Sequence, residues 1–259
     1  MARRAIIAGT GVLPRLLLEA APAHIVTFPG LPVPEKGAGR IEARFERLGQ
    51  LFDDLRRADV KEVCFAGAMT RPQLDPDALD DTTRGLMPRL MAAMAQGDDA
   101  LLRDVAALFE EQGFAVLGAR DLRPDLVAEA GCLCGDPLPE RDVARARAVL
   151  EALGPLDVGQ GAVAGYGQVL GIETLQGTDA MLRFVAETAP GSGGVLVKRP
   201  KAGQDLRLDM PAIGPDTVRR AAEAGLSGIE IAAGSVLLLD PGAVLAACEE
   251  TGLSLWAAP

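Results

Sequence analysis

The chain has 259 residues, of which 49% are hydrophobic, 24% charged and only 3% aromatic, and its formal net charge at pH 7 is −10. This composition is typical of a globular protein with an aliphatic core and excludes a long disordered chain. Both halves of the sequence are acidic and no run of Lys or Arg occurs, so we expect no nucleic-acid binding.

Two features bear on the compartment. The first apolar run, Ala5–Ala8, is too short for the core of a signal peptide, and no later run approaches the length of a membrane span. The four cysteines are scattered apart from the pair Cys132 and Cys134, unlike the disulfide framework of a secreted domain. We therefore expect a cytoplasmic protein whose membrane contact, if it has one, is peripheral.

In the first half of the chain, short apolar runs alternate with amphipathic stretches. In chain order, we expect a strand (Ala5–Ala8), a helix (Leu13–Ala20), a strand (His24–Phe28), a Pro/Gly-rich loop (Pro29–Gly39), a helix (Leu48–Arg57), a strand (Glu62–Ala66), a helix with its N-cap at Asp98 and its end at Gly113, and a strand (Phe114–Gly118). This α/β alternation predicts a parallel sheet covered by helices.

Gly, Cys and Pro cluster at Gly131–Pro139, where the pattern changes. We expect an N-terminal domain over residues 1–135, a linker with a connecting helix over 136–153, and a C-terminal α/β domain over 154–259. The expected C-terminal elements are strands Ala162–Ala164 and Gln168–Glu173 in a hairpin, a helix (Asp179–Glu187), a strand (Val195–Lys198), a helix (Thr217–Ala224), strands Gly228–Ala232 and Val236–Leu239, a helix (Ala243–Glu250) and a strand (Leu253–Ala257).

His24 is the only histidine, and it begins a predicted strand, where a structural role is the simpler interpretation. A site with several histidines is excluded, and Cys132-x-Cys134 lacks the second ligand pair of a zinc site. Acid–base chemistry therefore falls to carboxylates, lysines or a metal-bound water.

Gly9-Thr10-Gly11 follows a predicted strand and precedes a predicted helix, as a phosphate-binding turn does. The dinucleotide fingerprint is incomplete, because Pro14 replaces its third glycine and no acidic residue follows the second strand. This argues against NAD, and leaves open both a looser nucleotide contact at Gly9 and Gly11 and a purely structural turn.

From Asp205 the sequence alternates strictly between polar and apolar residues. If extended, Asp205, Arg207 and Asp209 share one face, with Lys198 and Lys201 upstream. Carboxylates suit a divalent cation and the guanidinium suits a phosphate. The Cα atoms of the two aspartates would be roughly 13 Å apart in a straight strand, so both reach one ion directly only if the chain bends. A solvated strand face explains the same pattern.

Three other segments have two interpretations each. Thr178 or Asp179 could serve as the N-cap of the helix that follows, or these side chains could contact an anion. The same two interpretations apply to Asp98. Arg71 reaches a nucleotide or lies in an exposed loop.

Long segments nevertheless resemble one family. They are IIAGTGVLP (6–14), FAGAMTRP (65–72), GDDALLRDVAALFEEQGF (97–114), LDVGQGAV (156–163), ETLQGTDAMLR (173–183) and KRPKAGQDLRLDMPAIGPDTV (198–218). In order and spacing they resemble the UDP-2,3-diacylglucosamine pyrophosphatases of the LpxI type, over nearly the whole chain.

The resemblance implies a Rossmann-like, nucleotide-binding N-terminal domain and a distinct C-terminal catalytic domain. It implies hydrolysis of UDP-2,3-diacylglucosamine with Mg²⁺, or alternatively Mn²⁺, to UMP and 2,3-diacylglucosamine 1-phosphate (lipid X) in lipid A biosynthesis. It also implies peripheral attachment to the inner face of the inner membrane, and it leaves a homodimer open.

By motif position, the resemblance implies roles for twelve residues. The catalytic residues are Asp205, Asp209, Lys198 and Lys201, of which the two aspartates also bind the metal; the substrate-binding residues are Gly9, Gly11, Arg71, Gln160, Thr178, Asp179, Gln204 and Arg207. Which aspartate is essential stays open. A pyrophosphatase for unacylated nucleotide sugars and a non-catalytic lipid or nucleotide-sugar binding protein are the alternatives.

Overall fold

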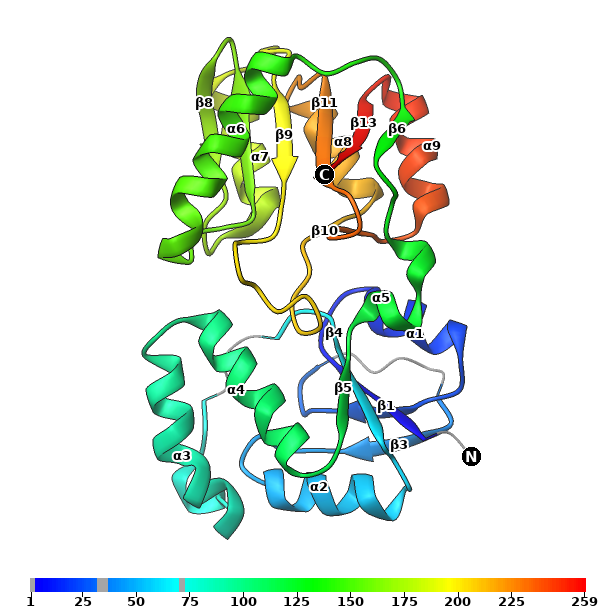
Figure 1. Ribbon diagram of the computed structural model, residues 1–259, viewed down its shortest axis with the longest axis vertical. Coiled ribbons are helices and arrows are strands. Elements are labelled where there is room, and N and C mark those ends of the chain that lie inside the picture. The colour runs from blue at the N-terminus through cyan, green and yellow to red at the C-terminus, as the bar shows by residue number, and fades with distance from the viewer. Residues whose placement is uncertain (1–2, 32–36, 70–72) are drawn as a thin grey trace. The chain divides into compact units, whose positions relative to one another are not determined.

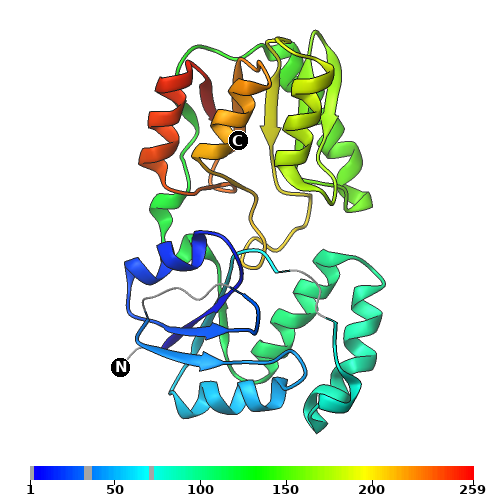
Figure 2. The same cartoon turned by 180° about the vertical axis from the view of Figure 1, so that it is seen from behind.

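The computed structural model describes residues 3–31, 37–69 and 73–259 and divides into two compact units, each drawn in Figures 1 and 2. Unit 1 comprises Met1–Pro124 and Arg207–Asp209, and unit 2 comprises Asp125–Leu206 and Met210–Pro259. Each unit combines its own sheet with helices, which confirms the expected α/β class.

Unit 1 is built on a five-stranded parallel sheet with the order β3-β2-β1-β4-β5. Its strands are β1 (Arg4–Ala8), β2 (His24–Thr27), β3 (Gly39–Glu42), β4 (Glu62–Ala66) and β5 (Ala115–Leu117). Its helices are α1 (Leu13–Ala20), α2 (Leu48–Arg57), α3 (Asp81–Met94), α4 (Asp98–Glu111), α5 (Ala119–Leu122) and the 3₁₀ turn η1 (Pro76–Ala78). This is the strand order of Rossmann folds, with the switch point between β1 and β4. The expected Rossmann-like sheet is confirmed.

Aromatic residues pack the core of unit 1, although they are rare in the chain. Six of the seven phenylalanines precede residue 115. Phe52 meets Phe109 edge to face at 5.2 Å between ring centroids, and Phe65 meets Phe109 in the same way at 5.3 Å. These rings fill the space between the sheet and helices α2 and α4, so this core is less purely aliphatic than the composition predicts.

Unit 2 contains a six-stranded mixed sheet with the order β6-β13-β11-β9-β7-β8 and a two-stranded parallel sheet of β10 and β12. Its strands are β6 (Gly131–Cys134), β7 (Gly161–Gly165), β8 (Gln168–Ile172), β9 (Val195–Lys198), β10 (Ala212–Ile213), β11 (Gly228–Ala232), β12 (Leu237–Leu238) and β13 (Ser254–Ala258). Its helices are α6 (Glu140–Leu153), α7 (Gly177–Thr188), α8 (Pro215–Glu223), α9 (Pro241–Thr251) and the 3₁₀ turns η2 (Pro124–Leu126) and η3 (Gly154–Leu156). Strands β9, β11 and β13 are parallel, and β6, β7 and β8 run antiparallel to their neighbours.

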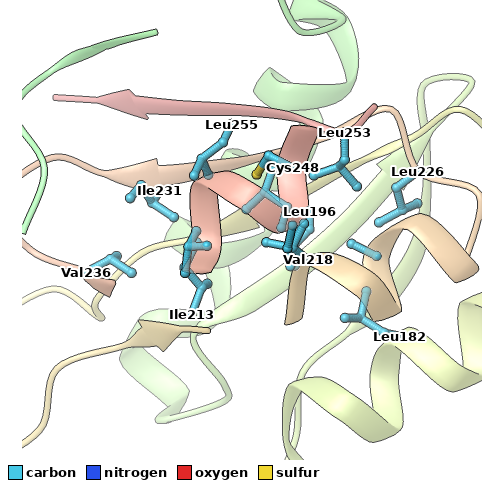
Figure 3. Close-up of a cluster of buried hydrophobic side chains, with 14 of the residues drawn as sticks. Leu182, Leu196, Ile213, Val218, Leu226, Ile231, Val236, Cys248, Leu253 and Leu255 are labelled. Carbon is cyan, nitrogen blue, oxygen red and sulfur yellow. The ribbon is translucent and has the colours of Figure 1, made fainter. Parts of the chain in front are cut away.

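Helices cover both faces of the unit 2 sheet. α7, α8 and α9 pack on one face, where Leu182, Leu196 and Val218 belong to the main buried cluster (Figures 2 and 3). α6 packs on the opposite face through Val143, Ala146 and Leu150, against β7 and β9. The prediction that residues 136–153 form a linker is therefore wrong, because α6 contributes to the core of unit 2, which begins at Asp125.

Two helix starts also differ from prediction. α4 is preceded by Gly97, with φ 124°, so Asp98 is the first helical residue and not the cap. Gln176 precedes α7, which places Thr178 and Asp179 inside its first turn. In both cases the negative side chain still lies at the positive end of the helix dipole, where it is stabilising.

The predicted extended segment from Asp205 onward is wrong. Residues 199–211 form an irregular connection between β9 and β10, with a turn at residues 206–208. No strand of the described chain pairs with it, so the alternation of polar and apolar residues does not reflect a sheet face.

Candidate functional site

A buried lysine marks the edge of the unit 2 sheet where β9 ends. Lys198 is the last residue of β9 and is only 5% exposed. Its Nζ donates to Thr178 Oγ1 at 2.7 Å and to the carbonyl oxygen of Ala212 at 3.3 Å. The ammonium group thus joins β9 to the first turn of α7 and to β10.

Glu173 completes this cluster, which we call the lysine cluster (Lys198, Thr178 and Glu173). Thr178 Oγ1 donates to Glu173 Oε1 at 2.9 Å, and Glu173 Oε2 lies 3.5 Å from Lys198 Nζ. Oε2 is inaccessible to solvent and forms no hydrogen bond within the described chain, so its contact with the ammonium is ionic. A buried carboxylate needs such a counter-charge.

Gly161 leaves the space that Glu173 occupies. A Cβ on Gly161 would lie 2.5 Å from Glu173 Oε2, so a larger residue there would displace the carboxylate. Glu173 is not among the site residues predicted from the sequence. Glu173 is the last residue of the predicted strand Gln168–Glu173, and no pattern in the sequence indicates its contact with Lys198.

The resemblance implies a catalytic role for Lys198, whereas its observed contacts are all with the protein. A lysine ammonium has three protons, and three oxygen atoms of the described residues lie at 2.7, 3.3 and 3.5 Å from it. This arrangement favours holding the start of α7 in place over donating directly to a substrate.

The other predicted site residues next to this edge form contacts outside the lysine cluster. Asp179 pairs with Arg220 of α8, with 3.2 Å between Oδ2 and Nε. Gln160 lies immediately before β7, and its carbonyl oxygen accepts from the backbone N–H of Arg199 at 3.0 Å. Unit 2 thus brings Gln160, Thr178, Asp179 and Lys198 to one end of its sheet.

The connection from β9 to β10 holds the other predicted residues. Lys201 pairs with Asp157, and its backbone N–H donates to Gln204 Oε1 at 2.9 Å. Arg207 pairs with Glu110 of α4 at 2.8 Å. Asp205 and Asp209 lie on either side of the turn at 206–208, the first in unit 2 and the second in unit 1. Within the described ranges, no group of three or more His, Cys, Asp and Glu side chains is arranged to hold a metal ion.

The glycine turn of unit 1 lies at the switch point of its sheet, and its backbone is already paired. Thr10 N donates to the carbonyl oxygen of Ala68 at 2.8 Å, and Ala68 N donates back to that of Thr10 at 3.1 Å. A Cβ on Gly9 would lie 2.5 Å from Ala68 O, whereas one on Gly11 would meet nothing within 4 Å. The close approach of two loops explains Gly9. Arg71 lies outside the described residues.

Family models match almost all of this chain. The LpxI N-terminal domain matches residues 3–126, and the LpxI C-terminal domain matches residues 130–256. The chain belongs to the LpxI family. Along the sequence, the boundary between the two LpxI domains lies between residues 126 and 130, close to the division of the structure after Pro124.

A curated relative in the LpxI family is the UDP-2,3-diacylglucosamine pyrophosphatase LpxI of Caulobacter vibrioides, 44% identical over 217 residues that cover 79% of this chain and 77% of that protein. Among solved structures, the dCMP deaminase of the cyanophage S-TIM5 in apo form matches 47% of this chain and 100% of its own at 15% identity, with a TM-score of 0.31. Within the described part of the LpxI chain, no helix is both long and apolar enough to cross a membrane.

Proposed function

We propose that this chain hydrolyses the pyrophosphate bond of UDP-2,3-diacylglucosamine to UMP and 2,3-diacylglucosamine 1-phosphate, a step of lipid A biosynthesis. The observation that carries the proposal is the 44% identity to a UDP-2,3-diacylglucosamine pyrophosphatase across most of both chains. The segments quoted in the sequence analysis contain all twelve residues to which the resemblance assigns roles.

The chemistry needs neutralised phosphate charge and an activated water. Mg²⁺ or Mn²⁺ would supply both, held by Asp205 and Asp209. Their carboxylate oxygens suit a hard cation, and the two residues flank the turn at 206–208. Lys201, Gln204 and Arg207 contribute polar groups along the same connection.

The lysine cluster supports this chemistry indirectly. Lys198 and Glu173 fix the first turn of α7, whose backbone N–H groups carry the partial positive charge of a helix start. With Thr178 and Asp179 in that turn, unit 2 presents a fixed polar edge for the phosphates. Gly9, Gly11 and Arg71 are further proposed substrate-binding residues.

The deciding experiment measures UMP release from UDP-2,3-diacylglucosamine with EDTA, and again after Mg²⁺ or Mn²⁺ is restored. We expect activity only with a metal, and a loss of at least about 100-fold in Asp205→Ala or Asp209→Ala. Asp216→Asn is the matched control, because Asp216 is an exposed carboxylate on α8.

Unacylated UDP-glucosamine serves as the competing substrate. Equal turnover of both compounds would assign the chain to general nucleotide-sugar hydrolysis. Tight binding of the acylated substrate without UMP release would show that the chain is a carrier. Full activity of both aspartate variants would show that Asp205 and Asp209 are not the metal ligands.

We also propose that the chain meets its lipid substrate as a peripheral protein at the inner face of the inner membrane. Co-sedimentation with vesicles that contain the substrate tests this, and vesicles without it are the control. The resemblance leaves a homodimer open, and sedimentation equilibrium measures the assembly.

A further inference from the structure

Unit 1 has a pocket of about 560 Å³ at the carboxyl ends of β2 and β3, away from the switch point. We call it the arginine pocket. Arg40, Arg44 and Arg47 line it together with Thr27, Phe28 and Gln50. Its volume is within the range of small-molecule sites, about 300–1,000 Å³.

The arginine pocket is basic although the protein is acidic. Among the described residues of its lining, three arginines and one carboxylate, Glu42, give a net charge of +2, against −10 for the chain. Arg40 is already engaged, since its Nε donates to Thr27 Oγ1 at 3.3 Å and its guanidinium pairs with Glu42 at 3.2 Å.

Arg44 and Arg47 differ from most other arginines of unit 1. Arg15, Arg56, Arg57, Arg84, Arg89 and Arg103 each pair with an Asp or Glu. The side chains of Arg44 and Arg47 form no hydrogen bond or ion pair within residues 3–31, 37–69 and 73–259. Two guanidinium groups that line the same pocket can bind an anion with charge-assisted hydrogen bonds.

The usual anion positions of this fold are occupied. The backbone groups of Thr10 and Ala68 bind each other at the switch point. The first N–H groups of α2 are also engaged, because Leu48 N donates to Thr83 Oγ1 at 2.8 Å and Gln50 N to Asp80 Oδ2 at 3.2 Å. An anion at the end of β2 therefore has to be held by the arginine side chains.

We infer that the arginine pocket binds the phosphoryl group of a small ligand, either a nucleotide or free phosphate. The pocket is far larger than a phosphate ion, and Phe28, Leu31 and Leu51 give it apolar walls beside the charged ones. The inference goes beyond the proposed hydrolysis, because binding at this pocket needs neither the metal nor turnover.

Isothermal titration calorimetry in EDTA tests the inference with three probes: UMP, inorganic phosphate and uridine. We expect UMP or phosphate to bind the wild-type protein and uridine not to bind. Affinity should fall about tenfold or more in Arg44→Gln/Arg47→Gln, because charge-assisted hydrogen bonds are lost. UMP binding much tighter than phosphate identifies a nucleotide, and equal binding identifies phosphate.

Arg15→Gln/Arg103→Gln is the matched control, with the same charge change on exposed helix surfaces of unit 1. Phenylglyoxal modification followed by mass spectrometry locates the site, since UMP or phosphate should protect Arg44 and Arg47 but not Arg15.

Three results would overturn the inference: no binding of UMP or phosphate to the wild type, equal binding by the two double variants, or equal protection by uridine. The two proposals fail separately. Protection of Arg44 and Arg47 in a protein that releases no UMP refutes only the hydrolysis, and an active protein without that protection refutes only the arginine pocket.

Discussion

Single residues decide how closely the two loops at the switch point of unit 1 approach each other. Gly67 has φ +88°, and a Cβ there would lie 2.2 Å from the carbonyl oxygen of Thr10. The sequence indicates a glycine turn at Gly9–Gly11, but the need for a second glycine opposite it appears only when β1 and β4 pair.

Gly67→Ala tests this contact. We expect the free energy of unfolding to fall by about 3 kcal/mol or more, because alanine meets both an unfavourable φ and a backbone atom. Gly11→Ala is the control, since φ is +92° there but a Cβ meets nothing within 4 Å; it should lose only about 1–2 kcal/mol. Urea unfolding curves measure both, and equal losses would contradict the close approach.

The lysine cluster gives a second prediction for single residues. Lys198→Met leaves the Glu173 carboxylate, 13% exposed, without its cation. We expect a loss of about 3 kcal/mol in unfolding free energy. The double variant Lys198→Met/Glu173→Gln should regain part of that loss, because it no longer buries an unpaired carboxylate. Lys61→Met removes an exposed pair with Asp59 and should cost less than about 1 kcal/mol. An additive double variant would show that the two side chains do not interact.

Among the helices, α2 and α3 share one capping carboxylate. Asp80 Oδ1 accepts from Thr83 N at 2.7 Å at the start of α3, and Oδ2 accepts from Gln50 N at the start of α2. Burial alone would raise the pKa of Asp80, but the hydrogen bonds from Thr83, Gln50 and Gly49 outweigh it and lower that pKa below its usual 3.8.

Asp80→Ala should therefore lower the unfolding free energy at pH 7 by about 1–2 kcal/mol. Because the folded-state pKa is lowered, the contribution of Asp80 is complete well above pH 3.8 and disappears as the pH falls below that value. Unfolding by urea at pH 7 and near pH 3 measures the change. Asp53→Ala on α2 is the control, and a pH-independent difference between wild type and Asp80→Ala would refute the charged cap.

Most elements could be predicted from local pattern, and the exceptions have physical causes. Leu13–Ala20, Leu48–Arg57 and Val195–Lys198 match the structure at both ends. β3 and β6 are short edge strands and were missed; β6 pairs with β13, about 120 residues later, which no local pattern shows. The false strand after Asp205 arose because Leu208 packs on the core of unit 1, so its burial does not come from a sheet.

At the scale of the whole molecule, the sequence predicts two domains but misplaces the boundary. The cluster of Gly, Cys and Pro at residues 131–139 resembles the start of a linker. The helix that follows it, α6, is instead part of unit 2, because Arg147 forms a bidentate pair with Glu230 of β11, with both bonds at 2.6 Å. The candidate site was predictable only in part. Motif positions gave Lys198 and Thr178, but Glu173 and the arginine pocket depend on neighbours that folding brings together.

One buried thiol lies in each core, which allows the two units to be followed separately. Burial raises the pKa of Cys64 in unit 1 to about 12 and that of Cys248 in unit 2 to about 11, so neither is a thiolate near neutral pH. We expect a thiol reagent to label exposed Cys132 at once, and Cys64 and Cys248 only when their own units unfold. Mass spectrometry across a urea series measures each site, and rapid labelling of either in native protein would contradict its burial.

The three residues Arg207–Asp209 belong to unit 1 although the chain around them belongs to unit 2. Cutting the gene once after Pro124 would thus deliver a first module without Leu208, which packs against its core. Recombination between relatives has the same consequence. A single crossover after Pro124 would pack Leu208 of one parent against the unit 1 core of the other parent. We therefore expect chimeras that exchange only one half of this protein to be less stable than either parent.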